Sequence, residues 1–147
     1  MSPALRNVLA VIAGLLIGLP VNMGLIILGP MVIPPPPGAD FTSPEGLEAA
    51  MPLMEPRHFV FPFLAHALGT LVGAIFTARF AASRQTAMAL VVGVFFLAGG
   101  IANVSMLPSP MWFNALDLLG AYLPIAFLGG QIGRRMRSSK GVPSSPR

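Results

Sequence analysis

The sequence predicts an all-α integral membrane protein, in which four transmembrane helices form a bundle and a short amphipathic surface helix lies between spans one and two. Of 147 residues, 54% are hydrophobic and only 10% are charged, and the mean hydropathy is +0.77. Glycine and proline, 16 of each, are frequent, which is typical of transmembrane helices. Four apolar segments also reach the length of about 20 residues that a helix needs to cross the hydrocarbon core. This composition is not that of a soluble domain.

The first span covers about residues 5–33. Arg6 precedes it, as in a secretory signal peptide, but the apolar stretch exceeds the roughly 7 to 15 residues of a signal sequence and no convincing small-residue cleavage site follows. We therefore expect it to remain as a membrane helix. Pro20 removes a backbone donor and clashes with the preceding turn, so it should kink this helix and leave residues 18–24 locally open.

The loop at 34–58 is the largest segment between spans. Its four prolines, at 34–37, cannot continue a helix and predict a short extended exit. A helix start follows, with Thr42 or Ser43 as the cap and Pro44 in the first turn. Apolar residues then recur at helical spacing: Leu47, Ala50, Met51 and Met54. This stripe predicts a short helix that either lies on the membrane surface or simply covers the end of the bundle.

The remaining spans cover about residues 59–81, 87–106 and 112–133. Short connections join them, so the four spans make one transmembrane domain over residues 1–136. The segment 137–147 is basic and polar, which predicts a disordered cytoplasmic tail.

Basic residues predict the orientation of the chain. With an even number of spans, both termini lie on one side of the membrane. That side carries eight basic residues: Arg6, Arg79, Arg84, Arg134, Arg135, Arg137, Lys140 and Arg147. The other side carries Arg57 together with the acidic residues Asp40, Glu45, Glu48 and Glu55. The positive-inside rule places both termini in the cytoplasm and residues 34–58 outside, with Trp112 as an outer interfacial anchor.

Two ionisable residues are predicted at the same depth in the membrane. His66 follows Phe59 by seven residues, which is about 10 Å along a helix, and Asp117 follows Trp112 by five, about 7 to 8 Å. Both spans run inward from the outer surface. A buried carboxylate is costly without a partner, and an imidazole can donate a hydrogen bond to it. We therefore predict a hydrogen-bonded pair of His66 and Asp117.

Other polar residues share the interior faces of the spans. Small and polar side chains line these faces, including Gly14 and Gly18 on the first span and Gly73 and Thr77 on the second, which would let helix backbones approach closely. The predicted intramembrane polar cluster comprises His66, Asp117, Asn22, Asn103, Asn114 and Thr70. Such residues serve either as interhelical hydrogen bonds or as a functional site.

The outer rim contains charged residues in the sequence "EPRH". Glu55 and His58 have the Glu-x-x-His spacing of di-iron bundles, but one copy lacks the ligand number that such a site needs. A salt-bridged corner, with Arg57 against Glu55 or a lipid phosphate, is favoured. The chain has no cysteine, so disulfides and thiolate sites are excluded. We predict no metal and no cofactor.

Two stretches, residues 55–74 and 99–130, resemble an uncharacterised family of small bacterial four-span inner-membrane proteins. These stretches are "EPRHFVFPFLAHALGTLVGA" and "GGIANVSMLPSPMWFNALDLLGAYLPIAFLGG". The resemblance implies a setting in the bacterial inner membrane and transfers no functional residue.

The features above predict a non-catalytic accessory, scaffold or assembly subunit, bound to a membrane protein partner or to further copies of itself. One alternative is a small-solute or proton-coupled transporter that uses the His66–Asp117 pair. A weaker alternative is an intramembrane enzyme that acts on lipid or quinone. The arrangement of charge favours the lipid bilayer over nucleic acid as the partner. A transporter needs a wet cavity that reaches the pair, whereas a purely structural subunit should keep the pair dry.

Overall fold

The computed structural model describes residues 1–138, and every regular element in that range is helical. The elements are α1 (Pro3–Val32), α2 (Pro44–Ala50), η1 (Met51–Leu53), η2 (Pro56–Phe59), α3 (Val60–Phe80), α4 (Gln85–Met106), α5 (Met111–Gly120) and α6 (Leu123–Ser138). Helix α6 thus continues into the segment predicted as a tail, and the rest of that tail, residues 139–147, lies outside the described residues.

Four helical segments are long and apolar enough to cross a membrane: Pro3–Val32, Pro56–Phe80, Gln85–Met106 and Met111–Arg137. They match the four predicted spans to within a few residues. Each span is a long apolar run, and a helix is one of the few structures that satisfies all backbone hydrogen bonds within such a run. The prediction of an all-helical chain with four such helices is therefore confirmed.

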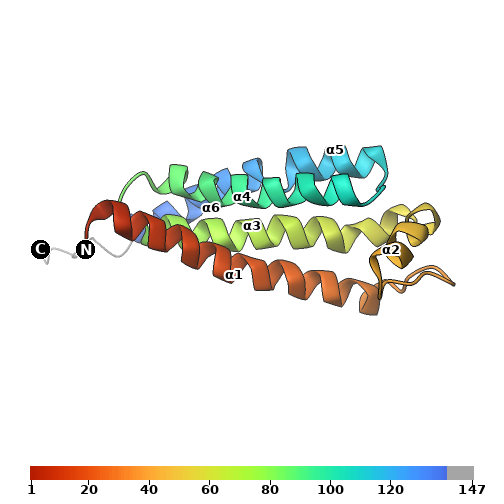
Figure 1. The fold of residues 1–147 in the computed structure, drawn as a ribbon. Coiled ribbons are helices and arrows are strands. Elements are labelled where there is room, and N and C mark those ends of the chain that lie inside the picture. The colour runs from red at the N-terminus through yellow and green to blue at the C-terminus, as the bar shows by residue number, and fades with distance from the viewer. Residues whose placement is uncertain (139–147) are drawn as a thin grey trace, which may run out of the picture.

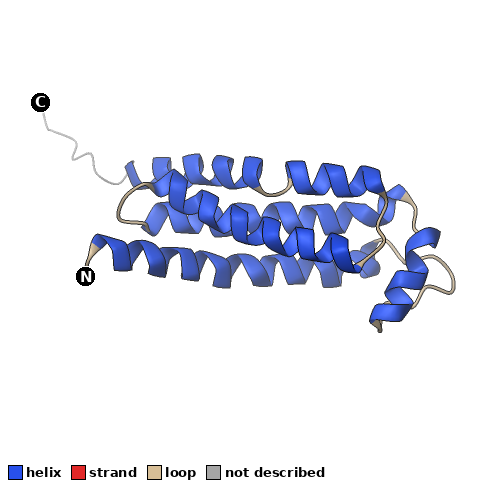
Figure 2. Cartoon of the chain, turned by 45° about the horizontal axis from the view of Figure 1, so that its top comes forward, coloured by secondary structure: helices blue, strands red, loops and turns tan. Residues whose placement is uncertain are grey.

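Helix α3 is the central element of the molecule (Figure 1). It packs along α1 on one side and against α4 and α6 on the other, whereas α1 touches α4 over only a short stretch. Figure 2 shows the same helices running side by side, with the connection before α3 gathered at one end. The molecule consequently has two unlike ends.

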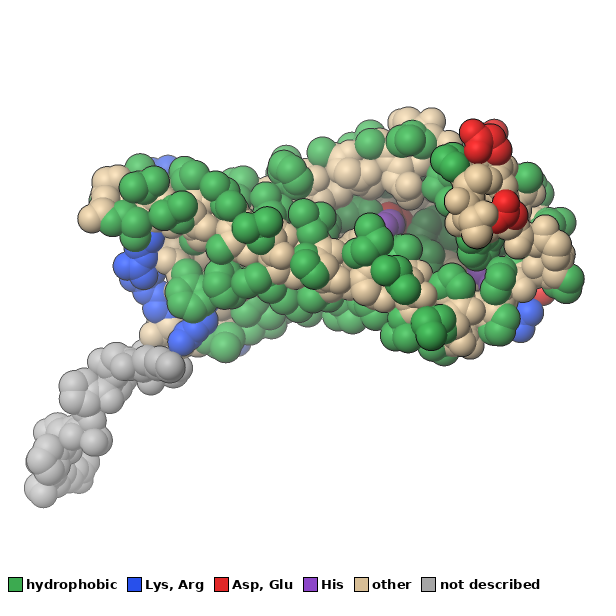
Figure 3. Space-filling model, turned by 60° about the horizontal axis from the view of Figure 1, so that its bottom comes forward, with side chains coloured by type: hydrophobic (Ala, Val, Ile, Leu, Met, Phe, Trp, Pro, Cys, Tyr) green, Lys and Arg blue, Asp and Glu red, His purple; other side chains and the backbone are tan. Residues whose placement is uncertain are grey.

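Charge distinguishes these two ends, as Figure 3 shows. We call the end formed by residues 34–59 the acidic end, and the end that carries the arginines of α6 and the α3–α4 turn the basic end. At the basic end Asn7 Oδ1 accepts hydrogen bonds from the amides of Ala82 and Ser83, at 2.7 and 3.3 Å, and Arg6 donates to the carbonyl of Phe80. These bonds fasten α1 to the α3–α4 turn.

Glycines allow α1 and α3 to approach closely near their middle. A Cβ added at Gly14 would overlap Thr77 Oγ1 and lie 2.6 Å from the carbonyl oxygen of Gly73. One added at Gly18 would lie 2.5 Å from the carbonyl oxygen of Gly69. Thr77 uses this proximity to donate a hydrogen bond to the carbonyl of Ala10 over 3.1 Å. The predicted small-residue faces therefore meet each other, a packing that is typical of membrane helices.

The interruptions of the long helices differ from those predicted. Helix α1 runs unbroken through Pro20, so the local opening expected at residues 18–24 is absent. The predicted fourth span, in contrast, is broken between α5 and α6 at Ala121 and Tyr122. Pro124 accounts for this break, because it has no amide hydrogen and its ring would clash with the carbonyl of Gly120.

The acidic end is closed by α2, η1 and η2. Ser43 caps α2 by accepting a hydrogen bond from the amide of Gly46 over 3.0 Å. Met51 and Phe59 are buried against Phe113 of α5. The predicted helix therefore packs as a cover on the other helices, which supports the simpler of the two interpretations of its apolar stripe.

Asp40 organises the chain just before α2. Its carboxylate accepts hydrogen bonds from the amide and the hydroxyl of Thr42, at 2.8 and 2.6 Å. These bonds hold the pKa of Asp40 below its ordinary value, even though the residue is exposed. The turn that leads into α2 is thus stabilised by the ionised form of Asp40, and protonation at low pH removes that contribution.

Candidate functional site

The structure brings His66 and Asp117 together, as their equal depth predicted. His66 Nδ1 lies 2.8 Å from Oδ1 and 2.9 Å from Oδ2 of Asp117. Tyr122 completes the group, because its hydroxyl donates to Asp117 Oδ2 over 2.8 Å and its ring stacks on the imidazole at 5.6 Å between centroids. Asp117 is only 2% exposed, so both of its oxygens are used inside the protein.

Three elements position this group. His66 comes from α3 and Asp117 from the last turns of α5, while Tyr122 sits in the break between α5 and α6. The break turns Tyr122 back toward Asp117, five residues earlier in the chain. Gly100 of α4 makes room for the phenol, since a Cβ there would lie 2.7 Å from Tyr122 Cζ. The loss of regular helix at Ala121 and Tyr122 is therefore what supplies the second hydrogen bond to the carboxylate.

The contacts of Asp117 determine how His66 is oriented. A carboxylate only accepts hydrogen bonds, so Nδ1 of His66 carries the hydrogen in their shared bond. That leaves Nε2, which has no hydrogen-bond partner among the described residues. A histidine held in this way presents one defined nitrogen to a ligand, in the manner of an imidazole oriented by a carboxylate.

His66 lies on the wall of a cavity of about 520 Å³ at the acidic end. The volume is within the range of about 300 to 1,000 Å³ that is common for small-molecule sites. The cavity is lined mostly by apolar residues of α1, of α3 and of the short helices that close the acidic end, among them Ile26, Phe61 and Leu47. Figure 3 shows histidine atoms deep in a hollow near the acidic end. The pair is therefore not sealed inside the helices, because one of its members faces this space.

Two further predicted residues line the same cavity. Asn22 of α1 and Asn103 of α4 both contribute to its wall, and their side-chain amides bond to no other residue of the described part of the chain. An amide without a partner is costly in an apolar environment. Together with His66 Nε2, the cavity thus presents three polar groups that a bound molecule or water could satisfy.

Asn114 and Thr70, the other two residues of the predicted polar cluster, do not line this cavity. Asn114 instead closes the turn between α4 and α5, since it accepts from Ser109 Oγ at 2.6 Å and donates to the carbonyl of Ser109 at 3.1 Å. Thr70 is fully buried, and its Oγ1 has no partner among the described residues. Helix-face counting does not predict these bonds, because they join a side chain near a helix start to the preceding turn.

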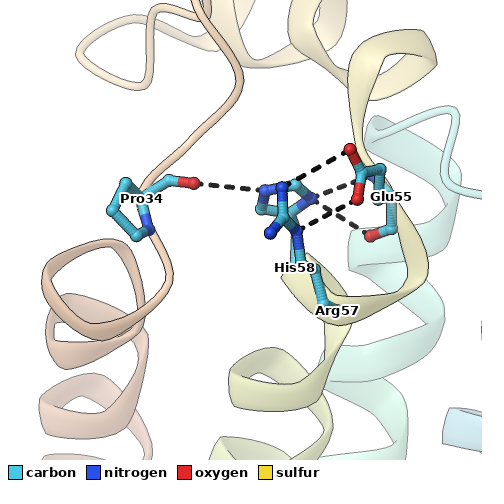
Figure 4. Close-up of polar contacts among 4 residues, drawn as sticks. All are labelled: Pro34, Glu55, Arg57 and His58. Carbon is cyan, nitrogen blue, oxygen red and sulfur yellow. Dashed lines mark hydrogen bonds and ion pairs between the residues drawn. The ribbon is translucent and has the colours of Figure 1, made fainter.

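The rim residues Glu55, Arg57 and His58 form a local structural motif (Figure 4). Arg57 Nε pairs with Glu55 at 3.0 Å, and both side chains are more than 60% exposed at 64% and 61%. His58 is buried, accepts at Nδ1 from the amide of Glu55 over 2.9 Å, and lies with Nε2 at 3.2 Å from the carbonyl oxygen of Pro34. His58 therefore ties η2 to the chain that leaves α1, and the predicted salt bridge is present beside it.

Replacing His58 with alanine is expected to lower the free energy of unfolding by about 1 to 2 kcal/mol, because two hydrogen bonds of about 1 kcal/mol each are lost. Thermal unfolding in detergent, followed by circular dichroism, measures the change. Arg57→Ala is the matched control, since an exposed ion pair contributes about 0 to 1 kcal/mol. Equal effects of the two substitutions would contradict the assigned role of His58.

Sequence reasoning missed Tyr122, which is 1% exposed and central to the site. A signal was present, because Pro124 predicts an interruption close to this tyrosine and a buried phenol needs a hydrogen-bond partner. No group of three or more possible metal ligands occurs within residues 1–138.

No protein-family model matches the chain, and neither a curated protein nor a solved structure is significantly similar to it. The resemblance to small bacterial four-span membrane proteins therefore stays a prediction. Function has to be argued from the geometry of the cavity and its polar groups.

Proposed function

We propose that the protein is a non-catalytic accessory protein of the bacterial inner membrane, a four-helix bundle that binds a small molecule in the cavity beside His66. The single observation that carries this proposal is that the two members of the His66–Asp117 pair have different surroundings. Asp117 is enclosed and fully hydrogen-bonded, whereas His66 lines a cavity of about 520 Å³ and its Nε2 has no hydrogen-bond partner among the described residues.

The same observation argues against a purely structural pair. Interhelical hydrogen bonds in membrane proteins contribute about 0.6 kcal/mol on average, and they need no cavity to do so. Here the cavity also collects the amides of Asn22 and Asn103. Three convergent polar groups in an apolar pocket are typical of a ligand site.

The absence of a neighbouring nucleophile in the cavity favours binding over catalysis. Ser109 is the one residue with a side-chain hydroxyl among those that line it, and that hydroxyl is already bonded to Asn114 at 2.6 Å. An acyl-transfer enzyme needs a nucleophile within hydrogen-bond reach of its base.

The charge distribution supports an orientation with the acidic end outside and both termini in the cytoplasm.

The proposal is tested by blocking the cavity. Ile26 lines it, so Ile26→Trp should occupy part of the space; Met23→Trp is the matched control, because Met23 is 56% exposed one turn away on α1 and is not part of the cavity wall. The proteins are extracted from native membranes in polymer-bounded discs, and bound small molecules are counted by native mass spectrometry. We expect a molecule at near-equal stoichiometry in the wild type and in Met23→Trp, and its loss in Ile26→Trp.

Circular dichroism and gel filtration establish that both variants remain folded. The same content of small molecules in folded Ile26→Trp and wild-type protein would refute the proposal. So would a wild-type protein that carries nothing in its native membrane.

A further inference from the structure

We infer that the occupant of the cavity is an uncharged membrane amphiphile with a hydroxyl head, which enters from the lipid side and bonds to His66 through that hydroxyl. This inference rests on the proposed function and names the ligand class of the same site. Three features of the cavity carry it: where it opens, which charges it lacks, and which hydrogen bonds it leaves unmade.

The cavity opens on the flank of the molecule. Figure 3 views the long helices from the side, and the hollow with its histidine atoms faces the viewer between apolar side chains. Ile27 on α1 and Asn103 on α4 both line the cavity and remain exposed, Ile27 by 62%. Helix α1 contacts α4 only briefly, and the cavity fills the gap between these two helices at the acidic end. In a membrane this gap faces lipid, so a lipid-soluble molecule has direct access.

Within residues 1–138, no side chain with a fixed charge lines the cavity. None of its lining residues is Asp, Glu, Lys or Arg. Asp117 is 2% exposed with its oxygens bonded to His66 and Tyr122, so it cannot reach a cationic head. A charged head would therefore be desolvated without a counter-charge, which is strongly unfavourable. The site selects for an uncharged polar group.

The unmade hydrogen bonds specify a group that both donates and accepts. Neutral His66 presents Nε2 as an acceptor, and protonated His66 presents it as a donor. The amides of Asn22 and Asn103 offer both kinds of atom. A hydroxyl can pair with all of these in either protonation state, whereas a lone carbonyl or ether oxygen can only accept. The apolar remainder of the wall, such as Ile26 and Phe61, suits the hydrocarbon part of the molecule.

The experiment uses the two histidines of the chain as probes. Full-length protein labelled with nitrogen-15 in histidine is placed in lipid nanodiscs, and the imidazole resonances are assigned with His58→Gln. Four single-chain amphiphiles of equal length are titrated: 1-dodecanol, 4-dodecylphenol, dodecanoate and dodecyltrimethylammonium. We expect the hydroxyl compounds to shift the His66 Nε2 resonance saturably. His58 lines the same cavity, but its Nε2 already lies at the carbonyl of Pro34, so its resonance should shift less than that of His66.

A matched pair of variants on α4 tests the polar contact without touching the His66–Asp117 pair. Asn103→Leu should weaken hydroxyl binding about three- to tenfold, the effect expected for one lost hydrogen bond. Ser105→Ala should leave it unchanged, because Ser105 bonds to the carbonyl of Ile101 in its own helix and does not line the cavity.

A stronger response to the phenol would identify a hydroxyaryl occupant, and a stronger response to dodecanol an aliphatic lipid alcohol; both support the inference. Equal or larger His66 shifts with either charged amphiphile would overturn it, as would silence with both hydroxyl compounds. If the hydroxyl compounds fail while Ile26→Trp still loses its native small molecule, the inference fails and the proposed function stands. If Ile26→Trp loses nothing, the proposed function itself fails.

Discussion

Replacing Asp117 with alanine is expected to lower the free energy of unfolding by about 3 to 5 kcal/mol, the range seen when one partner of a buried pair is removed. His66 Nδ1 and the Tyr122 hydroxyl both depend on this carboxylate and have no other partner among the described residues. Removal of Asp117 therefore leaves the buried Tyr122 hydroxyl and the half-buried His66 imidazole without a partner at the same time. Unfolding by titrated denaturing detergent, followed by circular dichroism, gives the change in stability.

Two companion substitutions separate the pair from general damage to α5. Tyr122→Phe removes one of the two hydrogen bonds to Asp117 and should cost about 1 to 3 kcal/mol. Leu119→Ala changes a residue of the same helix that is 76% exposed, and it should leave stability within about 0.5 kcal/mol of the wild type. A loss for Asp117→Ala no larger than that for Leu119→Ala would show that the carboxylate does not hold the helices together.

The second large effect is expected at the crossing of α1 and α3. Gly14→Ala places a methyl group onto Thr77 Oγ1 and 2.6 Å from the carbonyl oxygen of Gly73. The helices must separate, which costs about 1 to 3 kcal/mol for overpacking and about 1 kcal/mol more for the lost bond from Thr77 to Ala10. The same detergent unfolding measurement should show a loss of about 2 to 4 kcal/mol.

Gly24→Ala is the matched control for this crossing. A Cβ at Gly24 would meet nothing within 4 Å, although the residue lies on the same helix. Alanine has the higher helix propensity, by about 1 kcal/mol, so the control should be neutral or slightly stabilising. A similar loss at both positions would mean that glycine acts through helix flexibility and not through close packing.

Depth counting from the ends of two spans was enough to pair His66 with Asp117. It succeeds because a continuous helix converts residue number into distance at 1.5 Å per residue, and because both residues precede the break at Ala121. Helices α1 and α4 likewise carry Asn22 and Asn103, which line the cavity, although Asn103 stays exposed. This part of the site could therefore be predicted from the sequence, because its residues lie on regular helices.

Irregular structure accounts for what could not be predicted. Tyr122 approaches Asp117 because two residues leave the helix, and no periodicity describes that turn. The cavity lies beside the line along which α1 packs on α3, and glycines allow that close packing, among them Gly29 of the cavity wall. The side chain of Asn114 bonds to Ser109 in the preceding turn, and a helical wheel does not represent such a local hydrogen bond.

The central place of α3 has a consequence for how the chain is made. Helices leave the ribosome in order, so α1 and α3 can dock through their glycines while α5 is still unsynthesised. At that stage His66 has no partner, because Asp117 lies 51 residues further along the chain. Only the last span supplies the carboxylate that bonds to this imidazole. A nascent chain halted at Met106 would thus keep His66 without its carboxylate partner, and the finished protein would not.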